Sequence, residues 1–423
     1  MPMNHLKPRI APWLPILLVT ILSLALFLLP TQGVSFQTVV NDSIFYEKGR
    51  VEQVLDESLE PSALPGGQML GTQELAIRLE DGRRIELVNY LTDTHNVLVR
   101  EGARVVVCVD APEGVEPYYT LYNHDRSLPL AGIVLFFLVL MLLVGGRRGA
   151  ASAAALVFSV LLVLRVTIPA IYNGAQPVVM GLLTVLVSTA VTILLLYGWN
   201  LRGALAIGVT LGGECVACLL FLIFSACLRL TGFQTSDAEN LLVVAQHTGL
   251  RLGSVLFAAT MIASLGAVMD VAVSLLSALW ELAGAAEAPT RGQLLRSGLN
   301  VGRDIIGTNC NTLIFAFVGG ALMTILVLFS YGVQPNQLIS SDYVALELAQ
   351  GLCGTCAVIL TVPLASLAAA ACFGKQKVPG SGARRARRCC AIRRSGSVPL
   401  PTGGNKLSYR AQHFLFGCGL EHR

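Results

Sequence analysis

The stretch VLFAATMIASLGAVMDVAVSLLSALWEL occupies residues 255–282 and decides the fold class of this chain. It contains only two ionisable side chains, Asp270 and Glu281. A helix of roughly 20 such apolar residues crosses the hydrocarbon core of a bilayer. We therefore expect a transmembrane helix here, and a polytopic membrane protein if comparable stretches occur elsewhere.

Seven further runs have this length and apolar character. They are Trp13 to Pro30, Leu128 to Val144, Ala150 to Ile171, Val178 to Tyr197, Ala204 to Leu228, Ile305 to Tyr331 and Leu348 to Phe373. The first run is too long for a signal peptide and is interpreted as an uncleaved anchor. Only 13% of the 423 residues are charged, about half the fraction of an ordinary soluble domain. The sequence predicts an all-α polytopic membrane protein with about eight transmembrane helices.

Basic residues lie on one side of this arrangement. If the amino terminus is cytosolic, the inner segments hold Lys7, Arg9, Arg147, Arg148, Arg202, Arg291, Arg296, Arg303, Lys375, Lys377, Arg384, Arg385, Arg387 and Arg388. The outer loops 173–177 and 332–347 hold none, and cytoplasmic loops carry the excess of Lys and Arg. We expect both termini in the cytosol. Arg165, Arg229 and Arg251, at outer helix ends, are the exceptions.

Residues 31–127 change character, because charges return and apolar residues alternate. The runs Thr72 to Leu79 and Arg83 to Tyr90 flank Asp81-Gly82, a strong hairpin signal. Gly49 to Leu55 and Ala103 to Val109 are two more expected strands, whereas Asp56 to Gly71 resembles a loop. We expect a small extracytoplasmic β-rich, barrel-like domain.

Four regions follow from these patterns. They are a cytosolic end and anchor (1–30), the β-rich domain (31–127), a seven-helix transmembrane domain (128–374) and a basic cytosolic tail (375–423). The Gly, Pro and Ser content of the tail predicts disorder, with its arginines held near anionic lipid. Cys389 and Cys390 in the tail offer an alternative, acylation.

Several polar side chains interrupt the predicted spans. Asp270, Ser274, Ser277 and Glu281 are spaced to share one helical face. A charge at mid-bilayer is costly and needs a partner, water or a function. Either Asp270 binds a cation or carries a proton in a water-lined cavity, or a neighbouring helix holds it neutral or paired.

Two other places carry polar groups. Glu214 follows Gly212-Gly213, which weaken the helix as in the broken helices of transporters, although glycine also permits close packing alone. The densest cluster opens the seventh span, with Arg303, Asp304, Asn309, Asn311 and Thr312 as its strongest members. It either lines a functional cavity or joins helices. Arg303 is positioned to pair with Asp270 or Glu281.

Other chemistries have little support. Cys215 and Cys218, like Cys353 and Cys356, have a spacing that suits a soft metal, but buried cysteines are more often packing residues. We expect no metal and no cofactor. Phosphate-binding loops and hydrolase or metalloprotease motifs are absent from the sequence, so no enzyme is expected. The net charge of +4 does not indicate a nucleic-acid partner.

The run Leu265-Gly-Ala-Val-Met-Asp-Val-Ala272, with Gly302-Arg-Asp-Ile-Ile-Gly-Thr308 and Asn311-Thr-Leu313, resembles the YibE/YibF family of bacterial membrane proteins. Three further motifs are similar: Gly146-Arg-Arg-Gly149, Asn173-Gly-Ala-Gln-Pro177 and Leu360-Thr-Val-Pro-Leu364. The resemblance covers about residues 125–373. It implies location in the bacterial cytoplasmic membrane, and its longer members also have an amino-terminal span and an outer β-like domain. The paired cysteines and the Arg-rich tail are not part of the pattern.

A transport role is inferred for that family rather than demonstrated, and no substrate follows from it. Our first hypothesis is a secondary transporter or permease component, with Asp270 as proton or cation acceptor and Glu214, Ser274, Ser277 and the Arg303 cluster along the path. The rival is a non-transporting scaffold or sensor whose β domain binds a partner. Expected partners are the lipid bilayer, an unknown small solute or ion, and either another copy of the chain or another membrane protein.

Overall fold

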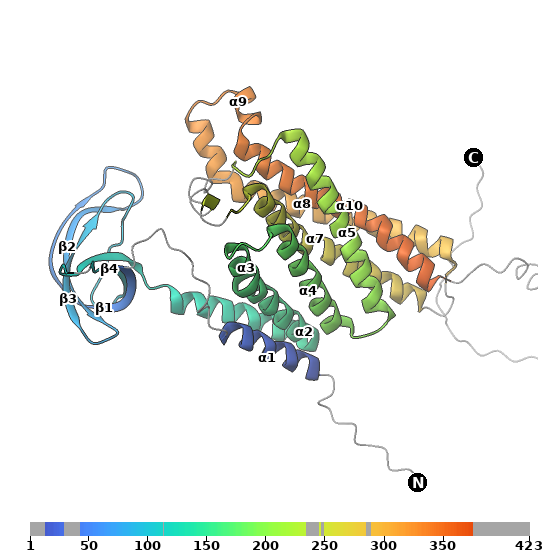
Figure 1. The fold of residues 1–423 in the computed structure, drawn as a ribbon, viewed down its shortest axis with the longest axis horizontal. Coiled ribbons are helices and arrows are strands. Elements are labelled where there is room, and N and C mark those ends of the chain that lie inside the picture. The colour runs from blue at the N-terminus through green and yellow to red at the C-terminus, as the bar shows by residue number, and fades with distance from the viewer. Residues whose placement is uncertain are drawn as a thin grey trace, which may run out of the picture. The chain divides into compact units, whose positions relative to one another are not determined.

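The computed structural model describes residues 13–28, 43–112, 114–233, 245–246, 249–284 and 289–374. These residues form a mainly helical part and one antiparallel sheet (Figure 1). The predictions about Lys7, Arg9 and the tail 375–423 concern residues outside this set.

Helices account for most of the described chain. They are α1 (Leu14–Leu28), α2 (Ser127–Leu162), the π-helical η1 (Val163–Thr167), α3 (Ile168–Tyr172), α4 (Pro177–Tyr197), α5 (Leu201–Leu228), α7 (Leu252–Ala283), α8 (Arg291–Ser330), α9 (Pro335–Ile339) and α10 (Asp342–Phe373). Taking α2, η1 and α3 as one element of 46 residues, six of these helices are long and apolar enough to cross a membrane. This suggests a membrane protein. The 15-residue α1 is also apolar but shorter.

The element that begins with α2 contains two of the predicted spans. Gly146 interrupts it with φ 54° and ψ −133°, a conformation that glycine adopts readily and other residues do not. Gly149 then packs against the carbonyl group of Met141, so the chain folds back at this point. One groove is lined by Leu135, Leu138 and Leu142 before the break and by Ala150, Ala154 and Val157 after it. The predicted boundary between the second and third runs therefore corresponds to a tight turn.

The remaining long helices form one bundle in which α10 packs against α5, α7 and α8 (Figure 1). Small residues allow these helices to approach closely. A Cβ atom on Gly212 would lie 2.7 Å from Leu364, and one on Gly181 would lie 2.9 Å from Ala258. The core between the helices is aliphatic, with Val271, Leu275 and Val362 among its fully buried residues.

The sheet has the strand order β3-β2-β1-β4-β5, with every neighbouring pair antiparallel. The strands are β1 (Ile44–Pro61), β2 (Met69–Leu79), β3 (Arg84–Leu91), β4 (Arg104–Asp110) and β5 (Tyr118–His124). The predicted hairpin is confirmed: β2 and β3 are joined by a turn in which Gly82 has φ +89°. Two register shifts in β1 help the sheet to curve. It forms a half-barrel around a core of Leu75, Ile77, Val105 and Val107.

Two details of the β prediction are wrong. Residues 118–124 form a fifth strand, which its tyrosines and its pairing with β4 stabilise. The segment expected to be a loop, Asp56 to Gly71, lies largely in strands, because β1 continues to Pro61 and β2 starts at Met69. Cross-strand pairing outweighs the low strand propensity of Glu, Pro and Gly in this segment.

The close approach of α5 to α7 and α10 is testable at Gly213, where a Cβ atom would collide with Thr361 and Val268. We expect Gly213→Val to destabilise the protein by about 1–3 kcal/mol through overpacking. Gly208→Val, in the same helix, is the matched control, because no atom lies within 4 Å of its Cβ position. Thermal unfolding in detergent measures both variants. Equal unfolding temperatures for the two would contradict the described packing.

Candidate functional site

The most deeply buried carboxyl group among the described helices is that of Glu214 on α5, which is 2% exposed. Its carboxylate lies between α5 and α7, where Ser264 Oγ is 3.0 Å from Glu214 Oε2. The same hydroxyl is 3.1 Å from the carbonyl oxygen of Met261. Because a hydroxyl has a single hydrogen, it donates to only one of these acceptors at a time. In the alternative arrangement, a protonated Glu214 donates to Ser264.

Part of this carboxyl group has no partner. Within the described residues, Glu214 Oε1 accepts no hydrogen bond, and the hydroxyls of Thr210 and Thr189 are also buried and unpaired. Thr210 is one helical turn before Glu214 and shares its face of α5. Thr189 on α4 and Thr210 on α5 are separated by nearly equal numbers of residues from the short connection that joins these two helices. Buried groups of this kind are rare in folded proteins and call for an explanation.

Other polar contacts extend along the same helices. Gln350 on α10 donates to Thr260 on α7 at 3.2 Å, one turn from Ser264. The Cys353 thiol donates to the carbonyl oxygen of Ala217 at 3.0 Å. We use the name polar seam for Thr210, Glu214, Thr260, Ser264 and Gln350.

The paired cysteines differ in how far they are exposed. Cys215 is exposed, Cys218 and Cys356 are half-buried, and Cys353 is buried. In the part of the chain that the structure describes, no group of three or more His, Cys, Asp or Glu side chains is arranged to hold a metal ion.

A second group of polar residues lies on the outside of the bundle. On α7, Asp270, Ser274 and Glu281 are exposed and Ser277 is half-exposed. On α8, Arg303, Asp304, Thr308, Asn311 and Thr312 are exposed and Asn309 is half-exposed. We use the name α7–α8 polar surface for Asp270, Ser274, Arg303, Asp304 and Asn311.

The members of this surface lie at similar heights along the two helices. Leu279 on α7 contacts the Cβ position of Gly298 on α8, and Gly354 on α10 has both Ser264 and Leu313 beside it. These approaches show that α7 and α8 are antiparallel and set their relative register. By this register Asp270 lies level with residue 307, and Ser274 lies level with Arg303. The polar surface therefore spans about 12 Å along the helices.

Hydrogen bonding differs among the residues of α8. Thr308 and Thr312 donate to carbonyl oxygens of their own helix, so neither needs a further partner. Arg303 donates to Asn300 Oδ1 at 3.4 Å. The predicted pairing of Arg303 with Asp270 or Glu281 is wrong for the described residues, in which none of the three has an ion pair. Asp270 and Asn311 likewise make no side-chain hydrogen bond there.

The structure thus divides the predicted site residues between two places. Glu214 belongs to the polar seam, whereas the other predicted residues lie on the exposed faces of α7 and α8. Val268 on α7 is buried against α5, and Asp270, two residues later, points away from it. Ser264, Thr260 and Thr210 were not predicted from the sequence. Their four-residue spacing, Thr260 to Ser264 and Thr210 to Glu214, is the signal that would have found them.

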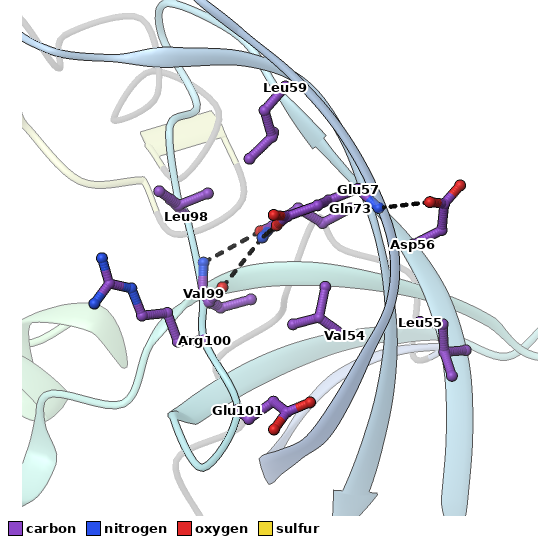
Figure 2. Close-up of a pocket in the computed structure, with 10 residues that line it drawn as sticks. All are labelled: Val54, Leu55, Asp56, Glu57, Leu59, Gln73, Leu98, Val99, Arg100 and Glu101. Atoms are coloured by element: carbon purple, nitrogen blue, oxygen red, sulfur yellow. Dashed lines mark hydrogen bonds between the residues drawn. The ribbon is translucent and has the colours of Figure 1, made fainter.

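The half-barrel contains a third candidate, a pocket of about 590 Å³. Figure 2 shows its lining by β1 residues such as Val54 and Asp56 and, opposite them, by the segment Leu98 to Glu101. Among the described strands, β1 pairs with β2 alone beyond residue 51, so its other edge borders this pocket. Such an edge is able to pair with another chain.

Two buried side chains hold the far wall of this pocket. Gln73 Nε2 donates to the Val99 carbonyl oxygen at 3.1 Å, and the Val99 amide donates to Gln73 Oε1 at 3.2 Å (Figure 2). Asn89 Nδ2 donates to the Val97 carbonyl oxygen at 2.9 Å. Side-chain amides therefore bond this extended segment in the way that a neighbouring strand would.

We expect Gln73→Ala to release the 97–101 segment, because it leaves both backbone groups of Val99 buried and unpaired. The local cost is about 1–3 kcal/mol for each group. Hydrogen-exchange mass spectrometry should show faster exchange in residues 95–101 than in the wild type. Gln53→Ala, an exposed substitution on β1, is the control. Unchanged exchange in Gln73→Ala would mean that the amide does not hold the segment.

A family model described as YibE/F-like protein matches residues 133–375, more than half of the chain. The polar seam and the α7–α8 polar surface lie within this region, and the half-barrel lies outside it. No curated protein and no solved structure matches the chain.

Proposed function

The chain belongs to the YibE/F family, and from this premise we propose that it is an integral protein of the bacterial cytoplasmic membrane with eight spans and both termini in the cytosol. The spans are α1, the two segments that meet at Gly146, α4, α5, α7, α8 and α10. Six long apolar helices support insertion. Arg147 and Arg148 follow the turn at Gly146, which suits a cytosolic position for that turn.

We further propose that the protein is a secondary transporter or permease component for a small solute or ion. The observation that carries this proposal is Glu214, a carboxyl group that is buried among helices and that has, among the described residues, a single hydrogen-bond partner and one unpaired oxygen. An unpaired charge in such surroundings is costly, so the group requires a proton or a cation. Exchange of either one at Glu214 would couple an ion gradient to movement of the bundle.

The surroundings of Glu214 suit this role. Ser264 either donates to the carboxylate or accepts from the carboxylic acid, so one geometry serves both protonation states. The hydroxyl of Thr210 and the free carboxylate oxygen offer further ligands for a small cation. Gly212 and Gly213 let α5 pack tightly against α10 at this level, where a small shift of either helix would change access to the seam.

We expect Glu214→Gln to abolish gradient-driven flux, because an amide of the same shape neither carries a proton nor neutralises a cation. The full chain is reconstituted into vesicles that enclose a pH-sensitive dye. Internal pH is followed after a potassium diffusion potential or a sodium gradient is applied. The variant should match empty vesicles, whereas the wild type should exceed them.

Glu281→Gln is the control, since this carboxylate is exposed near the end of α7 and should be dispensable. Thermal unfolding in detergent checks that both variants are folded. Wild-type flux no greater than that of empty vesicles, or full flux in Glu214→Gln, would contradict the proposal.

The pocket beside the free edge of β1 favours a second candidate function. In this alternative, the half-barrel binds a partner outside the membrane, and the protein acts as a scaffold or sensor without transport.

Deleting residues 43–124 separates the two functions. If the protein is a transporter, the deletion variant should retain flux that Glu214→Gln removes, because the seam lies wholly in the helices. If the protein is a scaffold or sensor, neither the full chain nor the deletion variant should give more flux than empty vesicles. The same dye-loaded vesicles measure both variants, with insertion verified by resistance to alkaline extraction.

A further inference from the structure

The described residues of a single chain leave the α7–α8 polar surface uncovered. Asp270 is exposed, has no described partner, and lies within about 3 Å of the middle of its predicted span, residues 255–282. A carboxylate at the centre of a bilayer is energetically costly unless it is paired, hydrated or neutralised. Lipid is therefore a poor neighbour for this face, and another group must cover it.

The surface carries both signs of charge at one height. Arg303 and Asp304 are consecutive, and the register of the helices places Asp270 about one turn away along the membrane normal. Asn311 adds an amide that donates and accepts. The surface also offers room for close approach, since a Cβ atom on Gly266 or Gly307 would have no atom within 4 Å.

This distribution has a symmetry consequence. Two copies of one chain enter a membrane in the same orientation, so a two-fold axis between them runs along the membrane normal. Each residue then meets groups of the other copy at its own depth. A surface is complementary to itself under this axis only if it carries opposite charges at the same depth, as Arg303 and Asp304 do.

We propose that the α7–α8 polar surface is the interface between two copies of this chain. The Arg303 guanidinium of one copy donates to the Asp304 or Asp270 carboxylate of the other, and the Asn311 amides bond to each other near the axis. A second copy thus supplies the positive partner that Asp270 lacks among the described residues of its own chain. This inference rests on the membrane insertion proposed above and is independent of transport.

Proximity of the two copies is tested by disulfide crosslinking of the full chain in vesicles of phosphatidylethanolamine and phosphatidylglycerol. All 11 native cysteines are replaced, and Asn311→Cys is introduced into this background. With a membrane-permeant oxidant, Asn311→Cys should form a covalent dimer. Leu219→Cys, at an exposed position on α5, is the matched control and should stay monomeric.

Charge exchange tests the chemistry of the interface. Dimerisation of dye-labelled full chains is measured by energy transfer as the chain is diluted in lipid. We expect Arg303→Asp to weaken dimerisation roughly three- to tenfold, as loss of an interhelical polar contact does. The double variant Arg303→Asp with Asp304→Arg should restore it. Arg291→Asp, exposed at the start of α8, should have no effect.

A chain that stays monomeric in pure lipid overturns the proposal and leaves a different membrane protein as the cover of this face. A dimer in which Asn311→Cys crosslinks no better than Leu219→Cys overturns the assigned surface. If the double charge variant fails to fold, crosslinking still decides. Extraction of the wild-type chain by alkaline carbonate would overturn the membrane topology together with this inference, whereas a monomer that resists extraction overturns the inference alone.

Discussion

The placement of polar side chains in apolar surroundings is the constraint on which the rest of this structure depends. In the part of the chain that the structure describes, Ser264 is the one side chain that bonds to the carboxyl group of Glu214. Burial of such a group costs free energy unless it is paired, protonated or bound to a cation. The protonation or cation-binding state of Glu214 therefore affects how favourable the packing of the surrounding helices is. This dependence makes the polar seam a candidate for coupling between an ion and a conformational change.

Polar side chains on the outside of the bundle are subject to the same constraint, but they face away from the neighbouring helices. Asp270 and Asn311 point away from their own chain, and aliphatic neighbours such as Ile305 pack inward against the core. In water this arrangement would be an ordinary solvated face. In a bilayer its polar groups would lack hydrogen-bond partners, because the hydrocarbon offers none. The protein thus presents one polar region that its own helices enclose and a second that they leave open.

The two regions lie on different sides of α7, since Ser264 is buried beside Glu214 of α5 and Asp270 is exposed. Glycines at positions 212, 213 and 302 bring α5 and α8 close to α10. In the half-barrel, polar groups fill a different role. Gln73 and Asn89 are buried and fully engaged with the backbone of the 97–99 segment, and they replace the strand that the sheet lacks there. Buried polar groups therefore have different structural roles in the half-barrel and among the helices.

The sequence by itself determined the class of the protein. Long apolar runs, the hairpin at Asp81-Gly82 and the family resemblance were all predicted from the sequence, because each depends on local composition or on spacing along one element. Strand extent was less readable, since β1 and β2 continue through residues of low strand propensity only because each supplies the partner of the other. Asp270 and Glu214 looked equivalent as acids within apolar runs. Only the tertiary structure decided that Glu214 faces inward and Asp270 faces outward, because this depends on which side of each helix its neighbours cover.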